Sequence, residues 1–200
     1  MKNLLIICVI LLLPSWIFAQ EQETTLKLYG IKSGIIDYKF SGTKEGSGTL
    51  YFDEFGQKSQ MYIDAIENGK RKKGWTLGLG ETHYLYDPES SSEGLKMGNP
   101  IIKKLKNQEH TDMEAITAEV YSKMGFKKEG KQTFLDKECD VWKGKKGMVL
   151  IWNGILLKME YTVYGYTTKQ EATTVSINVT VDPKLFEIPN NIQFTEMPGF

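Results

Sequence analysis

The sequence predicts an α+β fold in which a single antiparallel, strongly curved sheet carries helices across its concave side. Two blocks of alternating polar and apolar residues, at about 34–88 and 130–182, are divided by short turn-rich stretches, as in consecutive antiparallel strands. Between the blocks, at about 99–125, helical spacing replaces this alternation. Because the helices need an apolar partner and the sheet offers the largest one, we expect them to lie in its hollow.

The first nineteen residues have the pattern of a secretory signal peptide. A single lysine precedes an unbroken apolar run that Pro14 ends, and Ala19 is a small residue at the expected cleavage position. The run is short for a membrane span, although Ile17 is large for its position before the cleavage site, so an uncleaved anchor is the alternative. We expect cleavage near Ala19–Gln20, export to the periplasm or the extracellular medium, and one domain over residues 20–200.

The first block of alternation predicts a meander of antiparallel strands. We expect strands at 34–41, 48–55, 58–66, 75–80 and 82–88. The four cations between Gly69 and Gly74 are expected to form a solvated hairpin tip, and the functional alternative is a patch that binds anionic lipid or phosphate.

Two helical stretches are expected in the middle of the chain. Asn99 and Pro100 have the residue types of a helix cap and a first helical position. A second helix is predicted over 112–124, with a cap at Thr111 or Asp112 and an end at Gly125. The apolar stripe of this second helix consists of Met113, Ile116, Val120 and Met124.

The second block contains the clearest hairpin. Asn153-Gly154 is a preferred two-residue turn pair between two apolar runs. In the strand that follows, period-two alternation predicts that Leu157, Met159, Tyr161 and Val163 share one face. The same alternation recurs at 173–181, where Thr173, Val175, Ile177, Val179 and Val181 are expected on one face.

Three stretches of this second half carry a resemblance to a known family. They are Cys139-Asp140-Val141-Trp142, the hairpin from Trp152 to Glu160, and Phe186-Glu187-Ile188-Pro189. Together they resemble an uncharacterised family of exported bacterial proteins that is related to the periplasmic lipoprotein carriers (LolA-like proteins). The sequence departs from the family pattern at Leu156, where a proline is common, and at Asn190-Asn191, where a glycine is usual. The resemblance implies a half-barrel sheet closed by helices over an apolar cavity, with no catalytic motif.

The residues that most often carry chemistry give little support for an enzyme. Once Cys8 leaves with the signal peptide, Cys139 is the single thiol of the chain. Its acidic neighbours disfavour the thiolate form. We therefore expect Cys139 to be a buried core residue rather than a nucleophile or half of an intermolecular disulfide. His83 and His110 lack metal-ligand spacing. The loop with Asp87 and its acidic neighbours has the wrong offset for a calcium loop.

Two further features weigh against other partners. Lys+Arg and Asp+Glu number 25 each, and a neutral chain is a poor binder of nucleic acid. Asn178-Val179-Thr180 is a formal glycosylation sequon, but we expect it on a strand of a bacterial protein and assign it no role. The sequence therefore predicts no catalytic residue, no metal, no cofactor and no nucleic-acid partner.

Together these observations predict an exported, non-catalytic envelope protein that binds a lipid or another hydrophobic ligand in a half-barrel cavity. The alternative is a structural or interaction module with a filled core and no ligand. The expected partners are a lipid, an acyl chain or a lipoprotein, and no stable membrane span is expected after signal removal. The residues expected to line the cavity are Met113, Ile116, Val120, Met124, Trp152, Leu157, Met159 and Tyr161.

Overall fold

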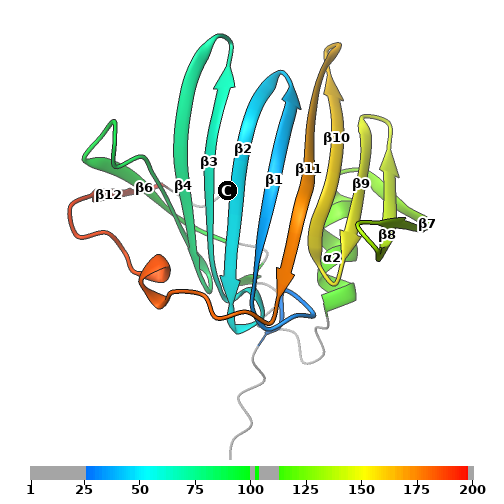
Figure 1. Cartoon of the computed structure of the whole chain (residues 1–200), viewed down its shortest axis with the longest axis horizontal. Coiled ribbons are helices and arrows are strands. Elements are labelled where there is room, and N and C mark those ends of the chain that lie inside the picture. The colour runs from blue at the N-terminus through cyan, green and yellow to red at the C-terminus, as the bar shows by residue number, and fades with distance from the viewer. Residues whose placement is uncertain (1–25, 100–101, 104–112, 198–200) are drawn as a thin grey trace, which may run out of the picture.

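A computed structural model describes residues 26–99, 102–103 and 113–197, which are built around one twelve-stranded sheet (Figure 1). The strands are β1 (Gly34–Gly42), β2 (Lys44–Asp53), β3 (Lys58–Glu67), β4 (Lys70–Leu79), β5 (Thr82–Tyr86), β6 (Glu93–Gly98), β7 (Phe126–Phe134), β8 (Lys137–Gly144), β9 (Gly147–Trp152), β10 (Ile155–Val163), β11 (Tyr166–Ile177) and β12 (Gln193–Glu196). Their order across the sheet is β12-β6-β5-β4-β3-β2-β1-β11-β10-β9-β8-β7.

The two predicted strand blocks are confirmed, and one pairing joins them. The first block is the meander β1–β6, and the second is the meander β7–β11. β1 pairs antiparallel with β11, from Gly34 opposite Ile177 to Gly42 opposite Thr168, so the sheet is continuous. β12 returns to pair parallel with β6, which makes the sheet mixed rather than purely antiparallel.

Left-handed residues form the tight turns of the meander. Asn153 and Gly154 have φ of 49° and 77°, which confirms the predicted two-residue turn. Asn68 and Gly69 have φ of 52° and 72° and close the hairpin between β3 and β4. This second turn is shorter than expected, because the cations that follow Gly69 already belong to β4.

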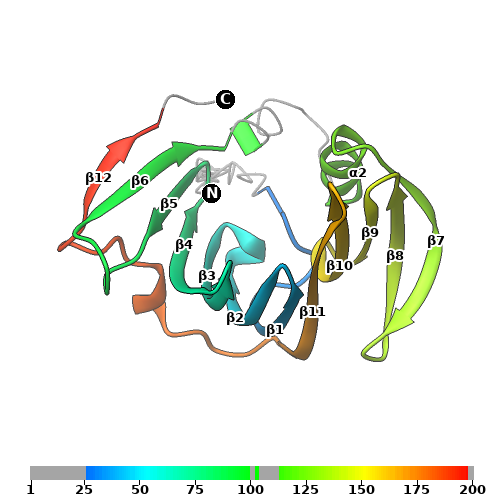
Figure 2. The ribbon, with the colours of Figure 1, turned by 90° about the horizontal axis from the view of Figure 1, so that it is seen from above.

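The predicted α+β half-barrel with helices across its concave side is wrong. The protein is mostly sheet, and the α-helix that is described in full is α2 (Met113–Lys123), which lies at one end of the sheet and contacts β7. Figure 2 shows the sheet as an open arc with α2 beside the strands β8–β10. Sequence reasoning missed β6 and β12, which are short and directly follow turn-rich stretches, and so underestimated the sheet.

The first predicted helix falls mostly outside the described residues. Pro100, Ile101 and residues 104–112 are not described, and this range includes the proposed caps Thr111 and Asp112. Asn99 does act as a cap, because its Oδ1 accepts a hydrogen bond from the backbone N–H of Ile102 at 3.1 Å.

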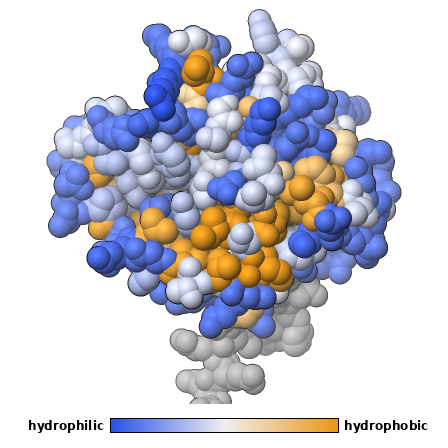
Figure 3. Space-filling model, viewed as in Figure 1, coloured by the Kyte–Doolittle hydropathy of each residue, from blue (hydrophilic) through white to orange (hydrophobic). Residues whose placement is uncertain are grey.

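Each face of the sheet packs against a different part of the chain. On the inner face, Tyr29 of the N-terminal segment meets Phe52 edge to face at 5.0 Å, and Ile36 and Tyr38 belong to the same core. On the outer face, Leu77 packs with the chain after β11, including the short 3-10 helix η2 (Pro183–Phe186). Figure 2 shows η2 outside the arc, and Figure 3 shows apolar surface gathered low in the centre of the face seen in Figure 1.

An aromatic row on the outer face holds the short strand β12 in place. Trp75 lies between Tyr62, at 4.7 Å, and Tyr86, at 6.2 Å between ring centroids, and Phe194 of β12 meets Tyr86 edge to face at 5.9 Å. Gly94 makes this approach possible, because a Cβ there would lie 2.6 Å from the Phe194 ring. Such cross-strand aromatic pairs stabilise a sheet by about 0.2–1 kcal/mol each.

Candidate functional site

Helix α2 ends where the sequence predicts. Gly125 follows the last turn with φ of 82°, and its N–H donates to the carbonyl of Ser122 at 2.9 Å. Glu119 and Lys123 form an ion pair one turn apart on the helix surface. The chain therefore passes directly from α2 into β7, and α2 packs against this strand.

One side of α2 covers an apolar cluster on the end of the sheet, here called the α2 cluster. Tyr121 of α2 lies 5.8 Å from the Trp142 ring and 6.2 Å from the Phe126 ring, measured between centroids. The pairing of β8, β9 and β10 aligns Trp142, Val149 and Met159 across the three strands. The α2 cluster consists of Ala118, Tyr121, Phe126, Trp142, Val149, Ile151, Leu156, Met159 and Tyr161.

Another side of α2 contacts the N-terminal segment. Ile116 is buried with Leu26 and Ile102, and Val120 packs against the same group. The segment itself is fixed to two hairpin turns: the backbone N–H of Tyr29 donates to Phe55, and that of Gly30 donates to Asn153. Helix α2 is thus held between the sheet and a strap that crosses the end of the sheet.

The structure divides the predicted cavity residues among three groups. Met159 and Tyr161 lie in the α2 cluster, as expected for residues under the helix. Leu157 and Trp152 instead belong to the core around β1, and Ile116 and Val120 face the N-terminal segment. An irregularity in the pairing of β9 with β10, between Leu156 and Lys158, separates Leu157 from Met159, because a β-bulge interrupts the alternation.

The two methionines predicted at the ends of the helical stripe do not add to the site. Met124 follows α2 and is 54% exposed, so the expectation that it points inward does not hold. Met113 begins α2, and its side chain lies outside the described ones.

Sequence reasoning missed the aromatic part of the site. Tyr121, Phe126 and Trp142 contribute three of its rings, and Tyr121 follows Ala118 by three residues, which is helical spacing for one face. That spacing was the available signal, but the stripe of Ile116 and Val120 is more apolar and gives the stronger pattern.

Polar groups at the α2 cluster are mostly paired. Lys128 of β7 bridges Glu114 of α2 at 2.9 Å and Asp140 of β8 at 3.0 Å, and these two carboxylates raise the pKa of Lys128. Tyr38 donates its hydroxyl to the carbonyl of Leu156 at 2.7 Å. The pKa of Tyr121 is raised, first because burial removes solvent from its hydroxyl and then by the electrostatic effect of the nearby Tyr29.

The exception among the described residues is the indole of Trp142. Its Nε1 is buried and has no hydrogen-bond acceptor within the part of the chain that the structure describes. Indole is a donor only, so no other hydrogen bond can compensate. Leaving such a group unsatisfied costs about 1–3 kcal/mol, and such an exception needs an explanation.

The alternative chemical sites gain no support from the structure. Cys139 is fully buried in the core, and burial raises the pKa of its thiol, which is the opposite of what a nucleophile requires. Burial also lowers the pKa of His83, because loss of solvent disfavours the charged form of its imidazole. Within residues 26–99, 102–103 and 113–197, no three metal-ligating side chains gather, and no helix is long and apolar enough to cross a membrane.

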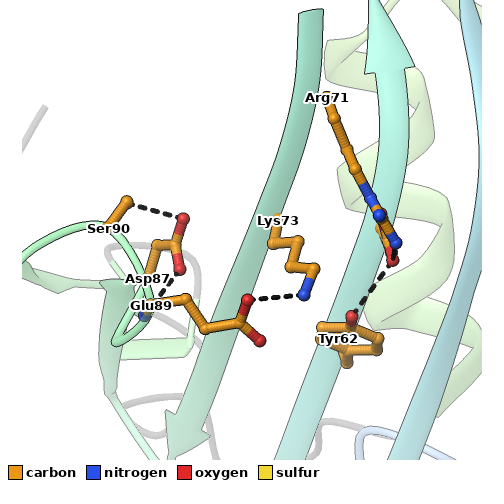
Figure 4. Close-up of polar contacts among 7 residues, drawn as sticks. Tyr62, Arg71, Lys73, Asp87, Glu89 and Ser90 are labelled. Carbon is orange, nitrogen blue, oxygen red and sulfur yellow. Dashed lines mark hydrogen bonds and ion pairs between the residues drawn. The ribbon is translucent and has the colours of Figure 1, made fainter.

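The basic stretch after Gly69 is largely neutralised. Arg71 pairs with Asp64. Lys73 pairs with Glu89, which belongs to the turn after β5 (Figure 4). Lys72 pairs with Glu67 on the neighbouring strand. The cations therefore lie on a solvated strand with local partners, which favours the structural interpretation of this stretch over an anion-binding patch.

A polar depression lies away from α2. It has a volume of about 320 Å³ and is lined by Lys32, Ser33, Asp53 and residues 178–181. The sequon begins in this wall: Asn178 is exposed and follows the end of β11, so the sequon is not on a strand as expected. The wall is largely polar, which does not suit an acyl chain.

Comparison with known proteins supports the fold and leaves the function open. No protein-family model and no curated protein matches the sequence. The fold is similar to that of an uncharacterized conserved protein from Thermus thermophilus, with a TM-score of 0.52 and 8% identity over 83% of this chain and 91% of that chain.

Two other solved structures are less similar. MucA/MucB of Pseudomonas aeruginosa gives a TM-score of 0.43 and 8% identity over 80% of this chain, which spans 57% of that chain. LprF from Mycobacterium bovis gives 0.33 and 10% identity over 83% of this chain and 92% of that chain. With TM-scores below 0.5, these two structures carry no argument about the fold or the function of this protein. The similarity to the Thermus thermophilus protein supports the fold alone, and the relationship to the lipoprotein carriers stays a prediction.

Proposed function

We propose that the protein is an exported, non-catalytic binding protein that takes an apolar ligand between helix α2 and the end of the sheet. In this proposal residues 1–19 are removed on export, and residues 20–200 act as one domain. The continuous sheet, in which β1 pairs with β11, supports the single domain.

The observation that carries the proposal is the way α2 covers an aromatic surface without belonging to the sheet. The twelve strands form one hydrogen-bonded ladder, and α2 is no part of it. The helix meets the α2 cluster through the side chains of Ala118 and Tyr121. A cover that is attached by side chains can shift, whereas a strand in the ladder cannot shift without breaking backbone hydrogen bonds.

The composition of the site suits a long apolar ligand. Met159 contributes a flexible, polarizable side chain, and four aromatic rings provide a broad apolar surface. Lys128 connects α2 to the sheet through partly exposed ion pairs, which are weak constraints in water. Opening of α2 would therefore expose an apolar surface with little electrostatic cost.

Native mass spectrometry of the mature protein, followed by organic extraction, tests the proposal. We expect a co-purified apolar compound, and binding of a pyrene-labelled alkyl chain by the extracted protein. The variant Ala118→Trp should reduce this binding, because its large side chain would occupy the contact between α2 and the sheet where the ligand is proposed to enter. The control Ser122→Trp places the same side chain on the exposed side of the same helix and should bind as the wild type does.

Failure of the wild type to bind any apolar probe would contradict the proposal and leave a structural or interaction module. Equal loss of binding in both helix variants would also count against it, because it would show that α2 is only being destabilised.

A further inference from the structure

The unpartnered indole of Trp142 gives the proposed site a chemical preference. Trp142 is 3% exposed and lies directly beneath α2, against the ring of Tyr121. Its Nε1–H has no acceptor among the described residues. Phenylalanine at this position would keep the ring packing and avoid the unsatisfied donor, so the indole calls for an explanation beyond packing.

We propose that the Nε1–H of Trp142 donates a hydrogen bond to a carbonyl oxygen of the bound ligand, which is an uncharged acyl ester or acyl amide. The inference rests on the proposed function. A ligand that brings an acceptor under α2 satisfies the buried donor and removes its energetic cost. The acyl chain then lies along the neighbouring apolar side chains of the α2 cluster, including Met159 and Tyr161.

The charges around the site favour a neutral acceptor over a carboxylate. Lys128 is the cation that links α2 to the sheet, and Glu114 and Asp140 already engage it. Lys146 approaches the Tyr161 ring at 6.0 Å, but it is exposed to solvent. A buried carboxylate would thus compete for a cation that is already paired, and burying an unpaired charge is far more costly than burying a hydrogen-bonded carbonyl.

The experiment compares two neutral probes that differ in one group. A pyrene-labelled acyl methyl ester and the corresponding pyrene-labelled alkane have similar apolar chains, but only the ester brings a carbonyl. The wild-type protein should bind the ester about tenfold more tightly, the difference expected for one buried hydrogen bond. Trp142→Phe should abolish this preference, so that the variant binds the ester and the alkane with equal affinity.

Trp152→Phe is the matched control. Trp152 is the same residue type in the same half of the sheet, but it packs in the core around β1 rather than under α2. This variant should keep the preference for the ester. A Trp142→Phe variant that still prefers the ester, or a wild type that binds both probes equally, would overturn the inference while the proposed function stands.

A second measurement observes the indole directly in the wild-type protein. In protein labelled with ¹⁵N in the indole of tryptophan, the Nε1–H resonance of Trp142 should move downfield when the ester binds and should move much less with the alkane. The Trp142→Phe spectrum identifies the resonance. An indole resonance that responds equally to both probes would overturn the inference, and a wild type that binds neither probe would overturn the proposed function with it.

Discussion

Replacing Met159 by tryptophan tests whether α2 can move away from the sheet. Met159 is partly buried in the α2 cluster, where side chains of α2 form the cover. Adding a larger side chain to a closed core costs about 1–3 kcal/mol. Because α2 can yield, we expect the low end of this range, about 1 kcal/mol, which lowers Tm by about 2–4 °C for a chain of this length.

Leu150→Trp is the matched control for this prediction. Leu150 is fully buried, and its strand, β9, is hydrogen-bonded to β8 and β10 on both sides. It packs in the core around β1 rather than under α2, so the loss should reach about 3 kcal/mol or more. Thermal unfolding followed by circular dichroism measures both losses. Equal destabilisation at the two positions would refute a movable α2.

Three further results are expected. The exported protein should have an intact mass that begins at Gln20; a membrane-bound species that retains residues 1–19 would contradict this. Cys139→Ala should lower the unfolding free energy by about 1 kcal/mol, and the native thiol should resist a bulky labelling reagent; rapid labelling would argue against burial. Because burial lowers the pKa of His83, the unfolded chain binds the proton more readily, so Tm should fall as pH drops below about 6.5. His83→Gln should weaken that fall; an unchanged pH dependence in this variant would contradict the assignment.

Local signals were enough to predict much of the sheet. The turn at Asn153-Gly154 and the end of α2 at Gly125 depend on backbone conformations that few residue types adopt, and both were found from sequence. The strands beside them followed from alternation. Such features depend on neighbours in the chain, which a single sequence displays directly.

Features that depend on distant contacts were missed. β12 pairs with β6 because Phe194 packs against Tyr86 and above Gly94, roughly one hundred residues away in the chain. The bulge beside Leu157 interrupts the alternation of side chains along β10, and no turn residue in the sequence marks it.

The candidate site could be predicted only in part for the same reason. Met159 and Tyr161 pack under α2 and follow the regular alternation after the bulge, and their role in binding stays a prediction. Trp142 was recognised only as part of a resemblance, because a sequence does not reveal that an indole N–H will be buried without an acceptor. A missing hydrogen bond is a property of the assembled fold alone.

Hydrogen exchange of the mature protein, with and without the pyrene-labelled acyl ester, tests the central claim most directly. If the ligand binds under α2, exchange should slow across residues 113–123 and on β8–β10, and it should stay unchanged in the meander β2–β4. Binding that protects only the outer aromatic row of Tyr62, Trp75 and Tyr86, or that leaves α2 exchanging as before, would contradict the account.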